Sequence, residues 1–109
     1  MLLVPVSMIA LSAQLVVRVA DAIPEFDITR GCRLDSAQAF DPSAGMNETI
    51  KKCVADERGA IEQLRKQWPQ FQDADKTQCL GETKIGGTAS YVDLLTCLQF
   101  AKDARQQSK

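Results

Sequence analysis

Residues 47–69 read NETIKKCVADERGAIEQLRKQWP and contain the pattern that decides the fold class. Their apolar residues recur with the 3.6-residue period of an α-helix and therefore share one face. These residues are Ile50, Cys53, Val54, Ile61, Leu64 and Trp68. Asn47 is a favourable N-cap, and Pro69 disfavours helical backbone angles at the residue before it, Trp68. The stretch predicts one long amphipathic helix that stops before Pro69.

The polar face of this predicted helix carries charges of both signs. The charged residues are Lys51, Lys52, Asp56, Glu57, Arg58, Glu62, Arg65 and Lys66. Glu57 also interrupts the apolar face. Because opposite charges alternate along the helix, we expect a solvated face on which these side chains form ion pairs.

Shorter helices are predicted on both sides of the long one. Upstream, residues 23–33 are expected to form an extended leader, and Asp35 begins a short capped helix that ends before Asp41. Downstream, a further helix opens at Asp73 and ends near Lys84.

The last helix has a start signal of its own. Ser90 and Asp93 have the spacing of a capping box, and Lys102 and Arg105 suit the negative C-terminal end. The residues expected to face the core are Tyr91, Leu94, Leu95, Leu98 and Ala101. Nothing after the first 22 residues reads as a buried strand. The sequence predicts a small all-α domain of three to four helices.

Four cysteines are expected to staple this domain with two disulfides. They are Cys32, Cys53, Cys79 and Cys97. An even number of cysteines in a small exported chain is typical of a disulfide framework. No close pair has the spacing of a zinc site or of a C-x-x-C redox motif, so we expect neither metal nor redox chemistry.

Two turns favour local pairing of these cysteines. Residues 41–45 lie midway between Cys32 and Cys53, and residues 86–88 lie midway between Cys79 and Cys97. The pairs 32–53 and 79–97 would each close a hairpin, whereas the nested pairs 32–97 and 53–79 remain an alternative. Closing one such loop contributes about 3 kcal/mol of stability in the chain-entropy description.

The first 22 residues are typical of a secretory signal peptide. Residues 2–17 read LLVPVSMIALSAQLVV, and the Ala-x-Ala pattern at Ala20 and Ala22 predicts cleavage after Ala22. The apolar run is shorter than the roughly 20 residues of a membrane span and contains Pro5. We therefore expect a single mature domain, residues 23–109, in the periplasm or outside the cell, with no membrane span after cleavage.

The composition argues against an enzyme and against a nucleic-acid partner. The 109 residues include no histidine, which removes Ser/His and Cys/His nucleophile pairs and the commonest metal ligand. The chain has 13 Lys and Arg against 14 Asp and Glu, a net charge of -1 that does not indicate nucleic-acid binding. A mature domain this small has little room for a substrate cleft. We expect no catalytic, cofactor or metal residues.

Two places could contact a partner protein. Asp73 and Asp75 form an acidic pair, and Ile85 with Gly86 and Gly87 lies in a connection where an apolar side chain could insert into a partner. A helix-capping role is the alternative for the aspartates, and an ordinary interhelical connection is the alternative for the loop.

Across nearly all of the mature chain, the motifs follow the order Cys32, Cys53, Trp68-Pro69, Cys79, Gly86-Gly87 and Cys97. This order resembles a group of small exported bacterial four-cysteine proteins of unassigned function. The second half contains, in order, Gln67, Trp68, Asp73, Cys79, Gly86, Gly87 and Cys97. In these residues it is distantly similar to the lysozyme-inhibitor-like (LprI-type) domain. The resemblance implies an all-helical module for an oxidising compartment outside the cytoplasm.

The function expected from these observations is a non-enzymatic protein-binding module of the bacterial cell envelope. Inhibition of a lysozyme-like muralytic enzyme is its most concrete form and depends on the resemblance. The alternative is a structural or stress-related periplasmic protein with no dedicated target.

Overall fold

The computed structural model describes residues 2–3, 22–38, 45–85 and 88–108. This part of the chain folds into α1 (Ile28–Gln38), α2 (Met46–Gln67), the 3-10 turn η1 (Trp68–Gln70), α3 (Asp73–Ile85) and α4 (Tyr91–Gln107). Strands are absent from the described ranges, and the predicted all-α fold with two disulfides is confirmed. Most of the expected signal peptide, and the expected turn around residues 41–44, lie outside the described residues.

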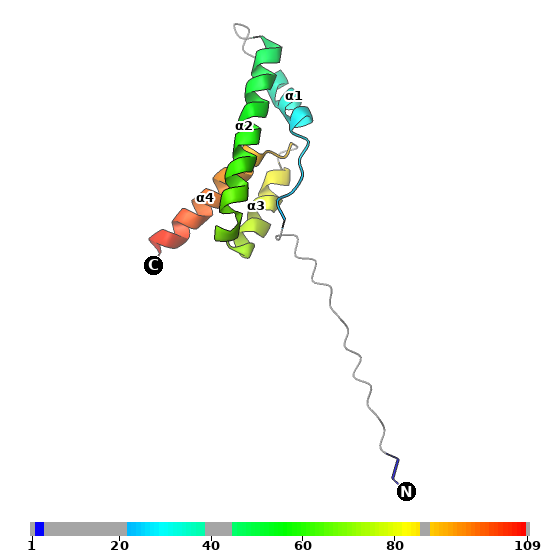
Figure 1. Ribbon diagram of the computed structural model, residues 1–109, viewed down its shortest axis with the longest axis vertical. Coiled ribbons are helices and arrows are strands. Elements are labelled where there is room, and N and C mark those ends of the chain that lie inside the picture. The colour runs from blue at the N-terminus through cyan, green and yellow to red at the C-terminus, as the bar shows by residue number, and fades with distance from the viewer. Residues whose placement is uncertain (1, 4–21, 39–44, 86–87, 109) are drawn as a thin grey trace.

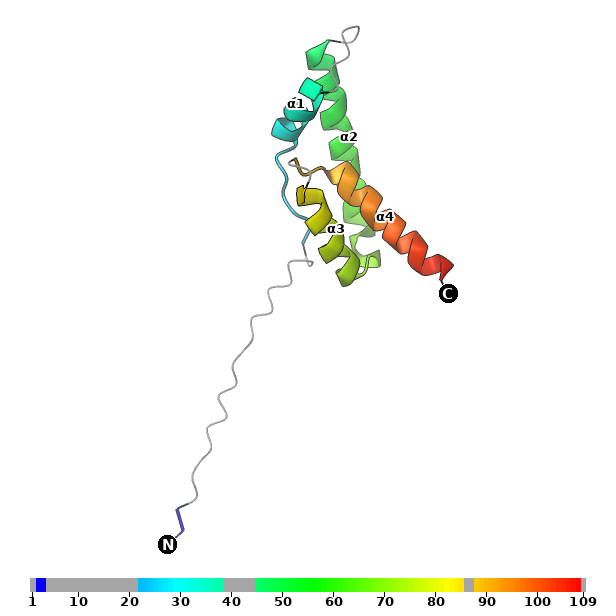
Figure 2. The same ribbon diagram turned by 180° about the vertical axis from the view of Figure 1, so that it is seen from behind.

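Helix α2 is the longest element and connects two parts of the molecule (Figures 1 and 2). Helix α1 packs beside its N-terminal half, and α4 crosses its C-terminal half and also contacts α3. We call α1 and residues 46–56 the arm, and residues 57–71 with α3 and α4 the body. No helix within the described ranges is long and apolar enough to cross a membrane.

The hydrophobic core lies in the body. Its buried residues are Ala60, Leu64, Trp68, Phe71, Cys79, Leu80, Tyr91, Leu94, Leu95 and Leu98. Leu64, Leu94 and Leu98 are completely inaccessible to solvent. The predicted apolar face of α2 is therefore buried only over its second half, because Ile50 and Val54 in the arm are partly exposed.

The two disulfides have the local pairing. The bond between Cys32 and Cys53 joins α1 to α2 within the arm, with 5.6 Å between the Cα atoms. The bond between Cys79 and Cys97 joins α3 to α4 within the body, with 5.7 Å between the Cα atoms. Each half of the molecule therefore has one cross-link of its own.

Helix α1 begins earlier than the sequence pattern predicted. The expected start at Asp35 is wrong, and the helix opens at Ile28. The physical reason is the side chain of Asp27, whose Oδ1 accepts a hydrogen bond of 3.0 Å from the backbone N–H of Arg30. An aspartate in this position caps a helix, so the extended leader ends at Asp27.

Both ends of α2 also differ from the prediction. Asn47 is not the N-cap, because the helix starts at Met46 after Gly45, whose positive φ of 79° suits glycine. Trp68 keeps helical angles, with φ −50° and ψ −45°, although Pro69 follows it. The α-helix nevertheless ends at Gln67, because the chain tightens into the 3-10 turn that contains Pro69.

Glu57 is buried and joins α2 to the start of α4, which corrects its expected place on a solvated face. Its Oε2 accepts a hydrogen bond of 2.6 Å from the backbone N–H of Tyr91, and its Oε1 accepts one from the hydroxyl of Ser90. The Ser90 Oγ in turn accepts from the backbone N–H of Asp93 and is the predicted N-cap. The positive N-terminal end of the α4 dipole also stabilises a carboxylate in this position.

Tyr91 attaches the leader to the body. Its hydroxyl donates to the carbonyl of Pro24 at 2.7 Å and accepts from the backbone N–H of Phe26 at 2.8 Å. The rings of Phe26 and Tyr91 lie 4.6 Å apart between centroids. Ile23 and Ile28 also pack against the core, so residues 23–28 are held along the body.

Candidate functional site

A hollow of about 390 Å³ lies beside the disulfide of the body, at the end of α3 where the chain leaves for α4. We call it the acidic hollow. It is lined by Asp35, Glu82, Thr83, Thr88, Asp93 and Cys97. The described part of this lining has three carboxylates and no lysine or arginine, so the hollow is a favourable place for a positively charged group.

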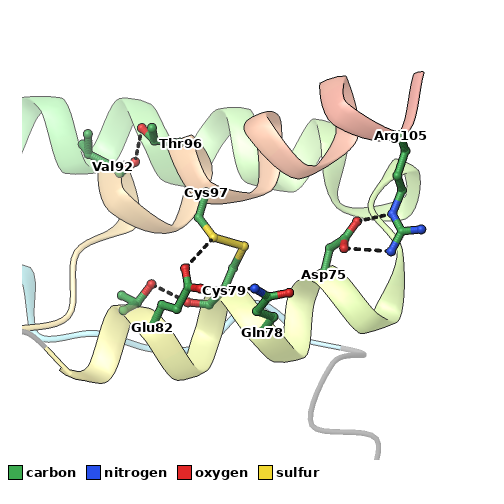
Figure 3. The surroundings of a disulfide bond; sticks show 9 residues. Asp75, Gln78, Cys79, Glu82, Val92, Thr96, Cys97 and Arg105 are labelled. Carbon is green, nitrogen blue, oxygen red and sulfur yellow. Dashed lines mark hydrogen bonds and ion pairs between the residues drawn. A yellow bond between two sulfur atoms is a disulfide. The ribbon is translucent and has the colours of Figure 1, made fainter. Parts of the chain in front are cut away.

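The disulfide and two hydrogen bonds fix the walls of the acidic hollow. Glu82 Oε2 lies 3.4 Å from Cys97 Sγ, and Glu82 Oε1 accepts from Gln78 Nε2 at 3.2 Å (Figure 3). On the α1 side, Asp35 Oδ1 accepts from Thr88 Oγ1 at 3.0 Å. Two of the three carboxylates are thus held by contacts within the protein.

Ile85 is the most prominent apolar side chain near this hollow. It is the last residue of α3 and is 84% exposed. Its position three residues after Glu82 places the two side chains on the same side of the helix. Gly86 and Gly87, the other expected contacts in this connection, lie outside the described residues. We call Ile85 and the acidic hollow together the loop-end surface.

Asp73 and Asp75, the other expected partner contacts, lie at the opposite end of α3. A helix rises 1.5 Å per residue, so Asp73 and Ile85 are about 18 Å apart along the axis. Asp73 is exposed and lies 3.7 Å from the Lys76 ammonium. The expected contacts therefore do not form one surface.

Asp75, which the sequence offered as a possible partner contact or a helix cap, forms an ion pair within the protein. Its carboxylate is buried and accepts two hydrogen bonds from Arg105, 2.7 Å from Nε and 2.9 Å from Nη2 (Figure 3). These hydrogen bonds lower the pKa of Asp75 from its usual value, and burial opposes them only in part.

A second hollow, of about 370 Å³, lies beside this ion pair. We call it the C-terminal hollow. It is lined by Gln70, Gln72, Asp75, Lys102, Arg105, Gln106 and Ser108. The Lys102 ammonium donates a hydrogen bond of 2.6 Å to Gln70 Oε1 across it. Lys102 and Arg105 were predicted only to interact with the helix dipole, but both also form contacts with other elements.

Glu82 and Asp93 were not predicted to belong to one site, although the sequence contains a signal for it. Glu82 follows Cys79 by three residues, and Asp93 precedes Cys97 by four. Residues at these helical spacings share a face with the cysteine. Once Cys79 and Cys97 are paired, both carboxylates are brought to the junction between α3 and α4.

Among the described side chains, no group of three His, Cys, Asp or Glu residues is arranged to hold a metal ion. No family model, no curated protein and no solved structure matches the chain. A function is therefore proposed from the sequence and from the geometry of the two hollows.

Proposed function

We propose that the protein is an exported, non-enzymatic protein-binding module of the bacterial cell envelope, and that its target is a lysozyme-like muralytic enzyme. The observation that carries this proposal is the exposed Ile85 beside the acidic hollow. An apolar anchor next to charged groups is a common composition for a protein contact. We propose no catalytic activity, because the chain has no histidine to act as a general base.

Two features support export. Disulfides persist in oxidising compartments and are rare in the cytosol, which favours the periplasm or the exterior. In addition, Ile23 packs against the core whereas Ala22 is exposed. The first residue after the expected cleavage position is thus part of the packed domain.

The charge and rigidity of the loop-end surface support a basic protein as the target. Three carboxylates attract a basic partner and speed its association, although the net charge of the whole chain is only -1. The disulfide between Cys79 and Cys97 holds the α3 and α4 parts of this surface together before binding, which reduces the entropy lost on association. The resemblance to the LprI-type domain favours a lysozyme-like enzyme among basic envelope proteins.

The direct test is a cell-wall lysis assay with a lysozyme, using the exported protein purified with both disulfides formed. We expect saturable inhibition at micromolar excess. Ile85→Asp should weaken inhibition about tenfold or more, because the apolar contact is lost at the centre of the interface. Phe100→Asp is the matched control, since Phe100 is also exposed, at 71%, but lies on α4 outside the loop-end surface.

Two results would contradict the proposal in different ways. If Ile85→Asp and Phe100→Asp weaken inhibition equally, Ile85 is not the specific contact with the target. Absence of inhibition at micromolar excess would remove a lysozyme as the target and favour a structural or stress-related envelope role instead.

A further inference from the structure

The C-terminal hollow is not used by the proposed function, and its lining is chemically different from that of the acidic hollow. Among the described residues of the lining, Lys102 and Arg105 supply two positive charges and Asp75 supplies one negative charge. Three glutamine side chains, from Gln70, Gln72 and Gln106, add amide groups around these charges. The hollow therefore has an excess positive charge and several neutral hydrogen-bonding groups.

Both cations are held in place by contacts across the hollow. Lys102 and Arg105 are three residues apart on α4 and reach the same side, Lys102 toward η1 and Arg105 toward α3. Asp75, only 8% exposed, fixes the guanidinium of Arg105 through two hydrogen bonds. This pre-orders a side chain that would otherwise lose conformational freedom on binding a ligand.

The held cations retain donors for a ligand. Asp75 accepts from Nε and Nη2 of Arg105, so Nη1 is directed away from the carboxylate (Figure 3). Lys102 uses one of its three N–H groups on Gln70 Oε1, and this leaves the Gln70 amide nitrogen as a further donor. Donors from η1 and α4 thus line one space of about 370 Å³.

We propose that the C-terminal hollow is a binding site for a short peptide with a free C-terminal carboxylate. A single excess positive charge suits a monoanion, and charge-assisted hydrogen bonds from a guanidinium and an ammonium suit the two oxygens of a carboxylate. The surrounding carboxamides suit the peptide groups that precede it. The volume is near the lower end for small-ligand sites and fits a ligand of a few residues.

A sugar fits this hollow less well than a peptide carboxylate. Carbohydrate binding would be helped by an exposed aromatic ring at the site, but Trp68 and Phe71 are buried in the core and do not line the hollow. The peptide proposal does not depend on the identity of the enzyme that Ile85 contacts, because the two hollows lie at opposite ends of the α3–α4 pair.

The test is an NMR titration of the full, oxidised protein with acetyl-alanyl-alanine, using the same dipeptide with a C-terminal amide as the matched ligand. We expect saturable shifts of the backbone amides of Gln72, Arg105 and Gln106 with the acid. The amide should bind about tenfold more weakly, because charge-assisted hydrogen bonds are lost. Equal binding of acid and amide, shifts centred elsewhere, or no saturable shift would overturn the proposal.

Two substitutions separate the site from general charge attraction. Lys102→Met should weaken binding of the acid about tenfold while leaving helix content unchanged, since it keeps the apolar stem and removes the charge. Lys66→Met, on the exposed side of α2, removes the same charge away from the hollow and should not change binding. Equal effects of the two substitutions would show non-specific attraction and overturn the site.

Discussion

The arm and the body are each cross-linked by one disulfide, but the two bonds have different surroundings. In the body, Cys79 is part of a core of ten buried residues that α2, η1, α3 and α4 supply together with Phe71. In the arm, Cys32 is 1% exposed, and among the arm residues whose burial is described the other buried one is the polar Ser36. Leu34 and Met46 are 48% and 37% exposed. The arm bond therefore substitutes for apolar burial, whereas the body bond adds to it.

This difference suggests that the two halves have different stabilities. Burial of apolar side chains is the main favourable contribution to folding, and the arm has little of it. Local opening concentrates where buried apolar contacts are few. We expect the arm to open on its own, and the body to unfold as one unit.

The largest effect is expected for a core residue of the body. Leu64→Ala should lower the free energy of unfolding by about 3–4 kcal/mol, because it removes completely buried methyl groups and leaves a cavity. The matched substitution in the arm, Leu34→Ala, should change it by less than about 0.5 kcal/mol. Urea unfolding followed by circular dichroism measures both, and a similar loss for the two would contradict the proposed difference between arm and body.

The disulfides provide the next largest effect. The loops closed by the two bonds are similar, with sequence separations of 21 and 18, so chain entropy predicts about 3 kcal/mol for each. The regions that lose hydrogen-exchange protection when each bond is removed should nevertheless differ. Replacing Cys32 and Cys53 by serine should remove hydrogen-exchange protection from the arm alone, whereas replacing Cys79 and Cys97 should lower protection throughout the body.

The control for this comparison is the unchanged half of each double variant. If the Cys32 and Cys53 variant also loses protection at Leu94 and Leu98, the arm and the body unfold together. The independence of the arm would then be wrong, although the energetic cost of each bond would stand.

The sequence predicted the elements whose signals are local. The 3.6-residue period gave the helices, Ser90 gave the start of α4, and the turns between neighbouring cysteines favoured the pairing that the structure has. The signal for the start of α1 was also local, because Asp27 directly precedes Ile28. The alternating apolar residues around it nevertheless favoured an extended leader. That leader is real over residues 23–27 and stops where the cap begins.

The parts that could not be predicted depend on distant residues. Glu57 looked like a break in an apolar face, because its partners Ser90 and Tyr91 are 33 and 34 residues away. The ion pair of Asp75 could not be predicted for the same reason, since Arg105 is 30 residues further along. A buried carboxylate is satisfied only by specific donors, and the sequence does not show which donors tertiary packing will bring to it.

Glu57 offers a smaller effect that sharpens the comparison within α2. Glu57→Gln should lower the free energy of unfolding by about 1–3 kcal/mol, because a buried acceptor of charge-assisted hydrogen bonds becomes a neutral amide. Glu62→Gln, on the exposed side of the same helix, removes only an exposed ion pair with Arg65 and should have an effect of less than about 1 kcal/mol. Equal effects in denaturant unfolding would place Glu57 on the surface in solution.

The smallest effect is expected from the ion pair of Asp75 and Arg105, because nearly half of the Arg105 side chain is exposed to solvent. The pair lowers the pKa of Asp75 in the folded protein, so its stabilisation is complete above the ordinary aspartate pKa of about 3.9 and is lost as the pH falls through the lowered value. Asp75→Asn should remove this part of the acid dependence of the unfolding free energy. Asp73→Asn, in the exposed first turn of the same helix, should leave it in place. An unchanged acid dependence in Asp75→Asn would mean that Arg105 does not hold the carboxylate in solution, and the guanidinium would then lack the fixed orientation on which carboxylate binding in the C-terminal hollow depends.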